Sequence, residues 1–553
     1  MDIIDRIRGV RDRLLHRSSD VRQPEEQAER SATEPPIDEP HENNRRATDE
    51  VVTTHDGKDY TEGQLFHLTN EIKDYQIVHG SLLKLVEYET ESSAPARAVG
   101  VSVLSTPFPR RCYDEAMELQ SIFNELYVRV AADPDWLYSV LGKLMEHDAL
   151  VSALWNVYLQ VKEAGVVQDI VCGVFRSDYM LHQPTLDEPV CLKQVEFNTF
   201  SCSGISHAER IANMHKHLAR VRSTDTNPSS WHDTRLPPSS NIQSVVNLLV
   251  TAHKRYTSFH PTTRPIGILM PVQPYNFNIA DERPIELGLW DAGIPCYRCI
   301  WFDALTRTTL TDSRTLLFRP TVGAAEVEIS VVYYRAGYAA EEYRSEGLAA
   351  RVRFEMSTAI KCLDILTNIT NFKAVQAALS QPGALERFLP ADKAEKLRKT
   401  FMPLLPLTAT TVEGQAARQI ALDPEQAVNY VLKPNLEGGG HNIYRSAIPA
   451  YLSSVPEETW EKYTLMRLIE PPATTGTLMM PQDLYHGEIV SELGVWGTCL
   501  WTRQEGEGGG ERGEVEIVEN NAAGWTFKSK PAEVDEMSVV KGYGCFDCPL
   551  LTD

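Results

Sequence analysis

The stretch YVLKPNLEGGGHNIY, residues 430–444, joins an apolar run to three consecutive glycines. The run 428–433 is typical of a strand, and Lys433 stands at its exit. A lysine there can hold its ammonium against a phosphate while the backbone N–H groups of the glycines close over the same anion. Because the lysine precedes the glycines, this is neither a P-loop nor a GxGxxG turn. The alternative is an ordinary glycine turn beside a solvated lysine.

A second stretch, KQVEFNTFSCS, begins at residue 193 and alternates as a half-buried strand does. The period of two puts Glu196 and Asn198 on one face, and Val195 and Phe197 on the other. Two oxygen ligands about 7 Å apart along a strand can bind a hard cation. With Glu437 as a third oxygen ligand beside the glycines, the pattern favours a Mg²⁺–nucleotide site. The alternative is a polar surface strand.

The composition limits the class of protein. The chain has 553 residues, enough for about three domains, and 76 acidic against 54 basic side chains give a net charge of −22. This balance argues against nucleic-acid binding, which needs a concentrated positive field. No apolar run reaches the ~20 residues of a membrane span, and the first residues lack the apolar core of a signal peptide. We therefore expect a cytoplasmic protein with no membrane association.

Ten cysteines in so long a chain do not suggest a disulfide scaffold. Two CxxC spacings occur, Cys296 with Cys299 and Cys545 with Cys548. The first pair lies on a predicted strand, where side chains three residues apart point to opposite faces. Zinc binding is disfavoured there, and reduced structural thiols are expected.

Short stretches in order along the chain resemble those of eukaryotic-type glutathione synthetase, a ligase family of the ATP-grasp superfamily. They are FRSDYM (175–180), QVEFNTFSCS (194–203), NIADERPIE (278–286), YYRAGY (333–338), KCLDILTNITNFKAVQ (361–376), LKPNLEGGGHNIY (432–444), YTLMRLIEP (463–471), SELGVWG (491–497) and KSK (528–530) with a downstream Asp-x-Pro. None of these stretches decides the question alone. Their order and spacing from about residue 60 to 550 carry the resemblance.

The resemblance implies an α/β fold of the ATP-grasp type. Residues 56–260 form the first part of its catalytic region with a helical segment, and 372–553 form the second part with the glycine-rich lid. Between them, 261–371 form an inserted small α/β substrate-binding domain. Residues 1–55 are polar and charge-mixed, so we expect a disordered extension after a short amphipathic helix at 2–16.

The resemblance also implies the reaction. ATP phosphorylates the cysteinyl carboxylate of γ-glutamylcysteine, glycine attacks the acyl phosphate, and glutathione, ADP and phosphate leave. Two Mg²⁺ ions with ATP and a homodimer are implied as well. Two alternatives stay open: a ligase that accepts β-alanine or serine instead of glycine, and a catalytically silent nucleotide-binding protein.

Carried over position by position, the resemblance assigns roles to residues of these motifs. The implied metal ligands are Glu196, Asn198 and Glu437. The implied catalytic residues are Arg176, Lys373 and Lys433. The implied ATP-binding residues are Met180, Lys373, Lys433, Glu437, Gly438, Gly439, Gly440, Asn442, Tyr444, Met466, Arg467, Leu468, Ile469, Glu492, Lys530 and Glu536. The implied substrate-binding residues are Arg176, Phe200, Ser201, Cys202, Ser203, Asn276, Asn278, Glu282, Arg335, Ala336, Gly337, Tyr338, Lys528, Val539 and Val540.

Some positions depart from the family pattern. Ala336 replaces the Asp of RDGY, and His441 replaces the first asparagine after the glycines. Arg467 and Leu468 replace Glu-Lys at the adenine hinge, where backbone recognition does not need those side chains. Lys528 replaces an arginine and loses the bidentate fork that holds a carboxylate. These departures leave acceptor specificity open.

Overall fold

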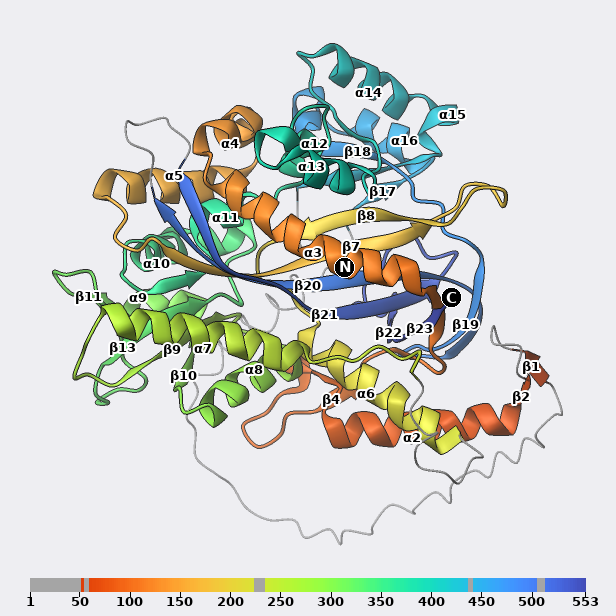
Figure 1. Cartoon of the computed structure of the whole chain (residues 1–553), viewed down its shortest axis with the longest axis horizontal. Coiled ribbons are helices and arrows are strands. Elements are labelled where there is room, and N and C mark those ends of the chain that lie inside the picture. Colours follow the sequence, from red (N-terminus) through yellow and green to blue (C-terminus); the bar gives the residue numbers. More distant parts are fainter. Residues whose placement is uncertain (1–50, 54–58, 223–233, 436–440, 505–512) are drawn as a thin grey trace, which may run out of the picture.

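The computed structural model describes residues 51–53, 59–222, 234–435, 441–504 and 513–553. Its largest sheet is built around three long strands, β7 (Ile170–His182), β20 (Leu484–Gln504) and β21 (Glu514–Pro531). β20 pairs antiparallel with β7 along one edge and with β21 along the other. These strands run through the middle of the molecule (Figure 1).

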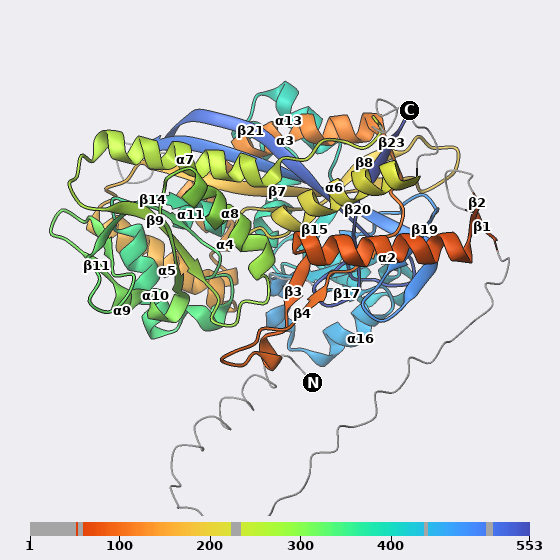
Figure 2. The ribbon, with the colours of Figure 1, turned by 90° about the horizontal axis from the view of Figure 1, so that it is seen from below.

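Helices cover both faces of this part of the sheet. Because side chains alternate along a strand, β20 buries Leu493 and Val495 on the side of α3 (Arg110–Ala131) and Trp496 on the side of α7 (Asn241–Phe259). Figure 1 shows α3 above the strands and α7 below them. The lower side is seen directly in Figure 2, where α7 is followed by α6 (Ile205–Arg222) and α2 (Glu62–His79). The central strands are therefore buried on both faces of the sheet.

One end of the sheet closes on itself. β20 pairs with β19 (Thr474–Met479), β19 with β5 (Val101–Ser102), β5 with β22 (Cys545–Asp547), and β22 with β21. Since β21 also pairs with β20, the five strands form a closed circuit. Beside it, β6 (Thr106–Pro109) pairs in parallel with β23 (Pro549–Thr552). The C-terminal segment is thereby joined to the strands near residue 100.

The other end of the sheet is a parallel α/β unit. Its strands are β9 (Ile266–Val272), β10 (Cys296–Ile300), β13 (Val327–Tyr333) and β14 (Ile360–Cys362), in the order β10-β9-β13-β14. β14 pairs with β7, so this unit continues the central sheet. Cys296 and Cys299 of β10 are buried in different core clusters, which confirms their predicted opposite orientation.

A second, smaller sheet lies above the first (Figure 1). Its order is β15 (Leu404–Pro406), β18 (Tyr463–Arg467), β16 (Tyr430–Pro434) and β17 (Ile443–Tyr444), all antiparallel. Helices α14 (Val412–Leu422) and α16 (Ala447–Ser454) bury their apolar side chains against it. β16 confirms the strand predicted before the glycines.

The remaining elements extend or flank these parts. The strands are β3 (Leu82–Lys84), β4 (Ala96–Ala98), β8 (Cys191–Asn198), β11 (Thr308–Leu310) and β12 (Leu316–Phe318). Among them, β8, β11 and β12 belong to the large sheet. The helices are α4 (Pro134–Leu141), α5 (Ala149–Ala164), α8 (Ile279–Asp291), α9 (Ala304–Arg307), α10 (Ser345–Glu355), α11 (Ile365–Ile369), α12 (Lys373–Leu379), α13 (Ala391–Arg398) and α15 (Pro424–Ala427). Among the described helices, none combines the length and the apolar character that a membrane span requires.

The structure differs from the sequence prediction at the N-terminal end. Residues 51–53, placed in the disordered extension, form β1 (Val51–Thr53), which pairs with β2 (Asp59–Thr61). The amphipathic helix predicted at 2–16 lies outside the described residues, as do Glu437 and the three glycines 438–440.

Candidate active site

A cavity of about 590 Å³ opens between the small sheet and the large one. Strands β7, β8, β20 and β21 form one wall, β16 to β18 form another, and loops of the parallel unit close it. Most residues predicted from the sequence line this one cavity. They are Arg176, Met180, Glu196, Asn198, Phe200, Ser201, Cys202, Ser203, Asn276, Asn278, Glu282, Arg335, Tyr338, Lys373, Lys433, Asn442, Tyr444, Met466, Arg467, Leu468, Ile469, Glu492, Lys528, Lys530, Glu536, Val539 and Val540.

Two lysines face the carboxylate of Glu196 in the cavity. Lys373, the first residue of α12, places its Nζ 2.7 Å from Oε2 of Glu196. Lys433 of β16 donates from its Nζ to the carbonyl oxygen of Val195 at 2.9 Å. Although burial opposes ionisation, the charges of both lysines hold the pKa of Glu196 well below its ordinary value. The carboxylate is therefore an anion at neutral pH.

Burial lowers the pKa of Lys433 to about 8. Glu196 opposes this shift, and the neighbouring ammonium of Lys373 adds to it. Lys433 is only 6% exposed, so few waters stabilise its charge. A phosphate at this position would supply the missing negative charge, and the arrangement is suited to an anionic ligand.

Asn198 has its amide oriented by two carboxylates. Its Nδ2 lies 3.1 Å from Oδ2 of Asp178 and 3.2 Å from Oε1 of Glu196. Carboxylates accept hydrogen bonds and do not donate them, so the amide must present its N–H₂ to them and turn its oxygen elsewhere. An amide oxygen beside an ionised carboxylate suits a hard cation such as Mg²⁺. The two residues therefore fit the predicted metal site, and the third predicted ligand, Glu437, is outside the described residues.

The predicted orientation of Val195 is wrong. The pairing of β8 with β7 shifts between Asp178 opposite Glu196 and Tyr179 opposite Gln194, so Val195 is the extra residue of a β-bulge. The bulge breaks the alternation, and Val195 lines the cavity instead of packing in the core. Phe197, beyond the bulge, is fully buried as predicted. The same bulge exposes the Val195 carbonyl to Lys433.

Arg176 is held at the centre of the cavity wall by Asp178. Its Nε and Nη2 atoms lie 2.7 and 2.8 Å from the two carboxylate oxygens of Asp178, and Nη1 donates to the carbonyl of Ser203 at 2.9 Å. The guanidinium also lies over the ring of Trp496, 5.3 Å from its centroid. Burial opposes the charge of Arg176, but Asp178 raises its pKa, so it stays a cation.

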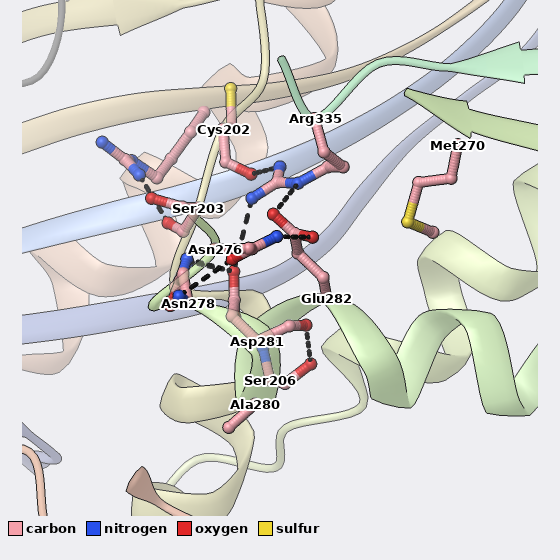
Figure 3. A network of polar contacts seen from close by, with 12 residues as sticks. Cys202, Ser203, Ser206, Met270, Asn276, Asn278, Ala280, Asp281, Glu282 and Arg335 are labelled. Carbon is pink, nitrogen blue, oxygen red and sulfur yellow. Dashed lines mark hydrogen bonds and ion pairs between the residues drawn. The ribbon is translucent and has the colours of Figure 1, made fainter. Parts of the chain in front are cut away.

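A network of charged side chains closes the far end of the cavity (Figure 3). The guanidinium of Arg335 lies between the carbonyl of Cys202 and the first turn of α8. Its Nε is 3.6 Å from Oε1 of Glu282, and its Nη2 is 3.6 Å from Oδ2 of Asp281. Asn276 donates to the other oxygen of Glu282 at 2.6 Å. This end therefore presents both a cation and an anion, the pair that an amino-acid head group needs.

Asp281 also fixes the loop that carries the predicted serines. It accepts hydrogen bonds from the backbone N–H groups of Gly204 and Ser206, each at 2.8 Å. Within this loop Ser201 has a positive φ of 51°, a conformation that costs a non-glycine residue energy. The strain is tolerated because neighbouring contacts hold the loop.

Two predicted substrate-binding residues do not line the cavity. The side chain of Ala336 is fully buried in the core. Gly337 donates its N–H to Glu342 at 2.9 Å, and its carbonyl accepts from the Tyr343 hydroxyl at 2.7 Å, so both of its backbone groups are used inside the protein. Of the YYRAGY stretch, Arg335 and Tyr338 line the cavity, whereas Ala336 and Gly337 make their contacts inside the protein, so the structure does not support their predicted contact with substrate.

Glu342 ties two cavity loops together. Its carboxylate accepts hydrogen bonds from the N–H groups of Gly337, Tyr338 and Ala339 at 2.9–3.0 Å. The side chain of Gln273, on the other loop, donates to it at 2.7 Å. Tyr338 and Gln273 both line the cavity, so Glu342 sets the distance between their loops.

The C-terminal strands contribute a second ion pair. Glu492 of β20 stands opposite Lys528 of β21, with 2.5 Å between Oε1 and Nζ. Burial raises the pKa of Glu492, and Lys528 opposes that shift. Beyond β21, Glu536 accepts a hydrogen bond from the backbone of Asn442 at 3.2 Å. The segment after β21 thereby touches the segment that follows the glycines.

Sequence reasoning missed several residues that line the cavity, among them Asp178, Gln273 and Arg445. Asp178 had a readable signal, because it stands two residues after Arg176 on one predicted strand and so shares its face. Gln273 and Arg445 lie in loops, where no periodicity indicates direction. Arg445 forms an ion pair with Asp535 of the C-terminal segment.

Comparisons with known proteins agree with one another. A family model described as eukaryotic glutathione synthase, ATP-binding domain, matches residues 62–551. The glutathione synthetase large chain of Schizosaccharomyces pombe is 30% identical over 499 residues, which cover 88% of this chain and 97% of that protein. Glutathione synthetase of Homo sapiens is 29% identical over 498 residues, with the same two coverages. A solved structure of a glutathione synthetase-like effector from Globodera pallida in its apo form shares the fold, with a TM-score of 0.67 at 18% identity, covering 91% of this chain and 100% of that one.

Proposed function

The chain belongs to the eukaryotic glutathione synthase family, and we propose that the cavity between its two sheets carries out the ligation of γ-glutamylcysteine to glycine. The protein is an ATP-dependent ligase with an ATP-grasp fold, and it makes glutathione. One observation carries the placement of the reaction. Segments that are far apart in the sequence, β7, α12, β16 and β21, each bring a lysine or arginine side chain to one cavity. The same cavity holds two side chains with oxygen atoms suited to binding a metal ion.

Nucleotide binding is proposed at the side of the small sheet. Lys373 and Lys433 would bind the phosphates, since both ammonium groups converge on Glu196 in the cavity. The backbone of 466–469, at the end of β18, would bind the adenine. Lys530 and Glu492 line the same part of the cavity, in keeping with contacts to ATP.

Glu196 and Asn198 would hold Mg²⁺ together with Glu437. Their support is the ionised carboxylate and the orientation of the amide. When bound, the ion would neutralise phosphate charge and orient the nucleotide. The number of ions, two by family resemblance, is part of the proposal.

Arg176 is proposed to act on the carboxylate that becomes phosphorylated. In the first step an oxygen of the cysteinyl carboxylate forms a bond to the γ-phosphorus of ATP and ADP leaves. In the second step the glycine nitrogen bonds to the acyl carbon, phosphate leaves, and the nitrogen loses a proton. A fixed guanidinium can stabilise the charge that both steps concentrate on these oxygens. Arg335 and Glu282 would hold the charged groups of the γ-glutamyl end.

Lys528 and the backbone of Val539 and Val540 are proposed to hold the acceptor amino acid. Lys528 already pairs with Glu492, so its ammonium would be shared between that carboxylate and the one of glycine. The other proposals that rest on family resemblance are a homodimer, a cytoplasmic location and the division into catalytic parts around residues 261–371. Light scattering, which measures the mass of the particle in solution, tests the homodimer directly.

The experiment is phosphate release with ATP, Mg²⁺, γ-glutamylcysteine and a panel of amino acids. We expect release with glycine to exceed release with β-alanine or serine, and glutathione to form in equal amount. Release that is fastest with another amino acid would assign a different acceptor. No release with any of them, despite ADP binding, would indicate a silent nucleotide-binding protein.

A further inference from the structure

Asp178 is a buried carboxylate in the cavity that we propose binds anionic substrates. Its side chain is only 2% exposed, and it lies in the middle of β7, which pairs on both edges. A negative charge there repels phosphates and substrate carboxylates, and a buried charge is costly unless it is paired. The surroundings of Asp178 show what offsets this cost.

The carboxylate holds Arg176 in one orientation. Two parallel contacts of 2.7 and 2.8 Å use the edge of the guanidinium formed by Nε and Nη2. The Ser203 carbonyl takes one N–H of Nη1 at 2.9 Å. Within the described part of the chain, one N–H on each of Nη1 and Nη2 has no acceptor, so both can donate to an external anion. Without Asp178 the long arginine side chain would have several rotamers available.

Asp178 is poorly suited to other roles. Its Oδ2 accepts from Nδ2 of Asn198 at 3.1 Å as well as from Arg176. Three donors already occupy its two oxygens, which leaves little room for a metal ion. Positioning is the role that these contacts leave.

The sheet is built around this pair. Gly494 of β20 stands opposite Asp178, and a Cβ at that position would lie 2.6 Å from Oδ1 of Asp178 and 3.0 Å from Cδ of Arg176. Any side chain at 494 would therefore push on the ion pair. Two residues further along, the ring of Trp496 lies beneath the guanidinium. The SELGVWG stretch thus contributes both the glycine that leaves space for Arg176 and the tryptophan ring that contacts its guanidinium.

We propose that Asp178 is the positioning residue that presents Arg176 to the reacting carboxylate, with Gly494 leaving room for the pair. The inference rests on the proposed function, because it assigns Arg176 to acyl activation. It adds a residue whose contribution to the reaction is to act through Arg176.

The test is a double-mutant cycle of Asp178→Asn and Arg176→Ala in the full-length chain, read by turnover with γ-glutamylcysteine and glycine. Asp178→Asn replaces an acceptor oxygen with an N–H₂ group facing two donors, so kcat should fall about 10- to 100-fold while KM for ATP changes less than about twofold. In the Arg176→Ala background the same change should cost nothing or restore some activity. The reason is that, once Arg176 is gone, Asp178→Asn removes a buried carboxylate that has lost its ion-pair partner.

Independent effects that multiply in the double variant would overturn the proposal, as would wild-type kcat in Asp178→Asn. The pH profile separates positioning from base catalysis: Asp178→Asn should keep the wild-type shape, and loss of its acidic limb would contradict a positioning role. Asp133→Asn is the matched control. Asp133 is likewise buried and paired with an arginine, Arg387 at 2.6 Å, but it lies outside the cavity lining, so kcat should stay within twofold.

Thermal denaturation of the same cycle reads the pair without turnover. Each single change should lower the melting temperature. The double variant should lose less than the sum of the two single losses. Additive losses would overturn the proposal. A wild-type protein that binds nucleotide, shows this coupling and makes no glutathione would refute the proposed function and leave the ion pair established.

Discussion

Lys433 should bind nucleotide only as a cation, so raising the pH above about 8 should weaken binding. Burial lowers its pKa from 10.5 to about 8 in the free protein, which corresponds to roughly 3 kcal/mol against the charged form. A bound phosphate favours the charged form and raises the pKa again. Below pH 8 the lysine is protonated with or without nucleotide. Above it, binding must take up a proton, and affinity falls by up to tenfold per pH unit.

We expect ADP to bind about 30-fold more weakly at pH 9.5 than at pH 7. ADP itself does not explain such a change, because its last phosphate ionisation, near pH 6, is complete over most of this range. Isothermal titration calorimetry in two buffers of different ionisation enthalpy measures both the affinity and the proton uptake. We expect uptake to rise toward one proton per ADP between pH 8 and 9.5.

Lys433→Arg is the control for this prediction. Arginine stays charged throughout the range, so the pH dependence should flatten even if the affinity at pH 7 is lower. Burial also lowers the pKa of Lys530, so the ADP affinity of the Lys433→Arg variant should keep a weaker dependence on pH. ADP affinity that is constant from pH 7 to 9.5 in the unmodified protein, with no proton uptake, would refute the assignment of Lys433 to the phosphates.

Three further changes test other parts of the cavity. Glu196→Gln should reduce turnover by orders of magnitude while circular dichroism and ADP-free stability stay near wild type, and normal turnover would remove β8 from the site. Glu342→Gln should raise KM for γ-glutamylcysteine about tenfold, because one oxygen that now accepts backbone N–H groups becomes a donor; an unchanged KM would show that the loops hold without it. Gly494→Ala should lower the unfolding free energy by about 1–3 kcal/mol and reduce kcat, since its Cβ would lie 2.6 Å from both Asp178 Oδ1 and Thr526 Cγ2. Denaturant unfolding and steady-state kinetics measure both effects, and wild-type values in both would contradict the close approach.

The strands that build the site were predictable because their periodicity is local. β8 carries Glu196 and Asn198 toward the cavity and Phe197 toward the core, as the alternation indicates. Val195 escaped prediction because a bulge depends on how the partner strand is aligned, and nothing in the stretch itself marks it. Local pattern gives the face of a residue only while the register is regular.

Contacts between distant segments could not be read from the sequence. Glu492 and Lys528 form an ion pair because β20 and β21 align them opposite each other, and that register is set by the whole antiparallel pair. Asp178 could be placed on the face of Arg176, but its burial follows from β20 packing Gly494 against it. Ala336 was assigned to the substrate by its motif, whereas the core around it decides its direction.

The most direct test of the proposed reaction is the product itself. Purified protein is incubated with ATP, Mg²⁺, γ-glutamylcysteine and ¹⁵N-labelled glycine, and the products are identified by mass spectrometry together with released phosphate. We predict glutathione carrying one ¹⁵N and one phosphate released per tripeptide formed, with neither product when γ-glutamylcysteine is left out. Phosphate released without labelled glutathione, or no phosphate at all despite bound nucleotide, would contradict the account.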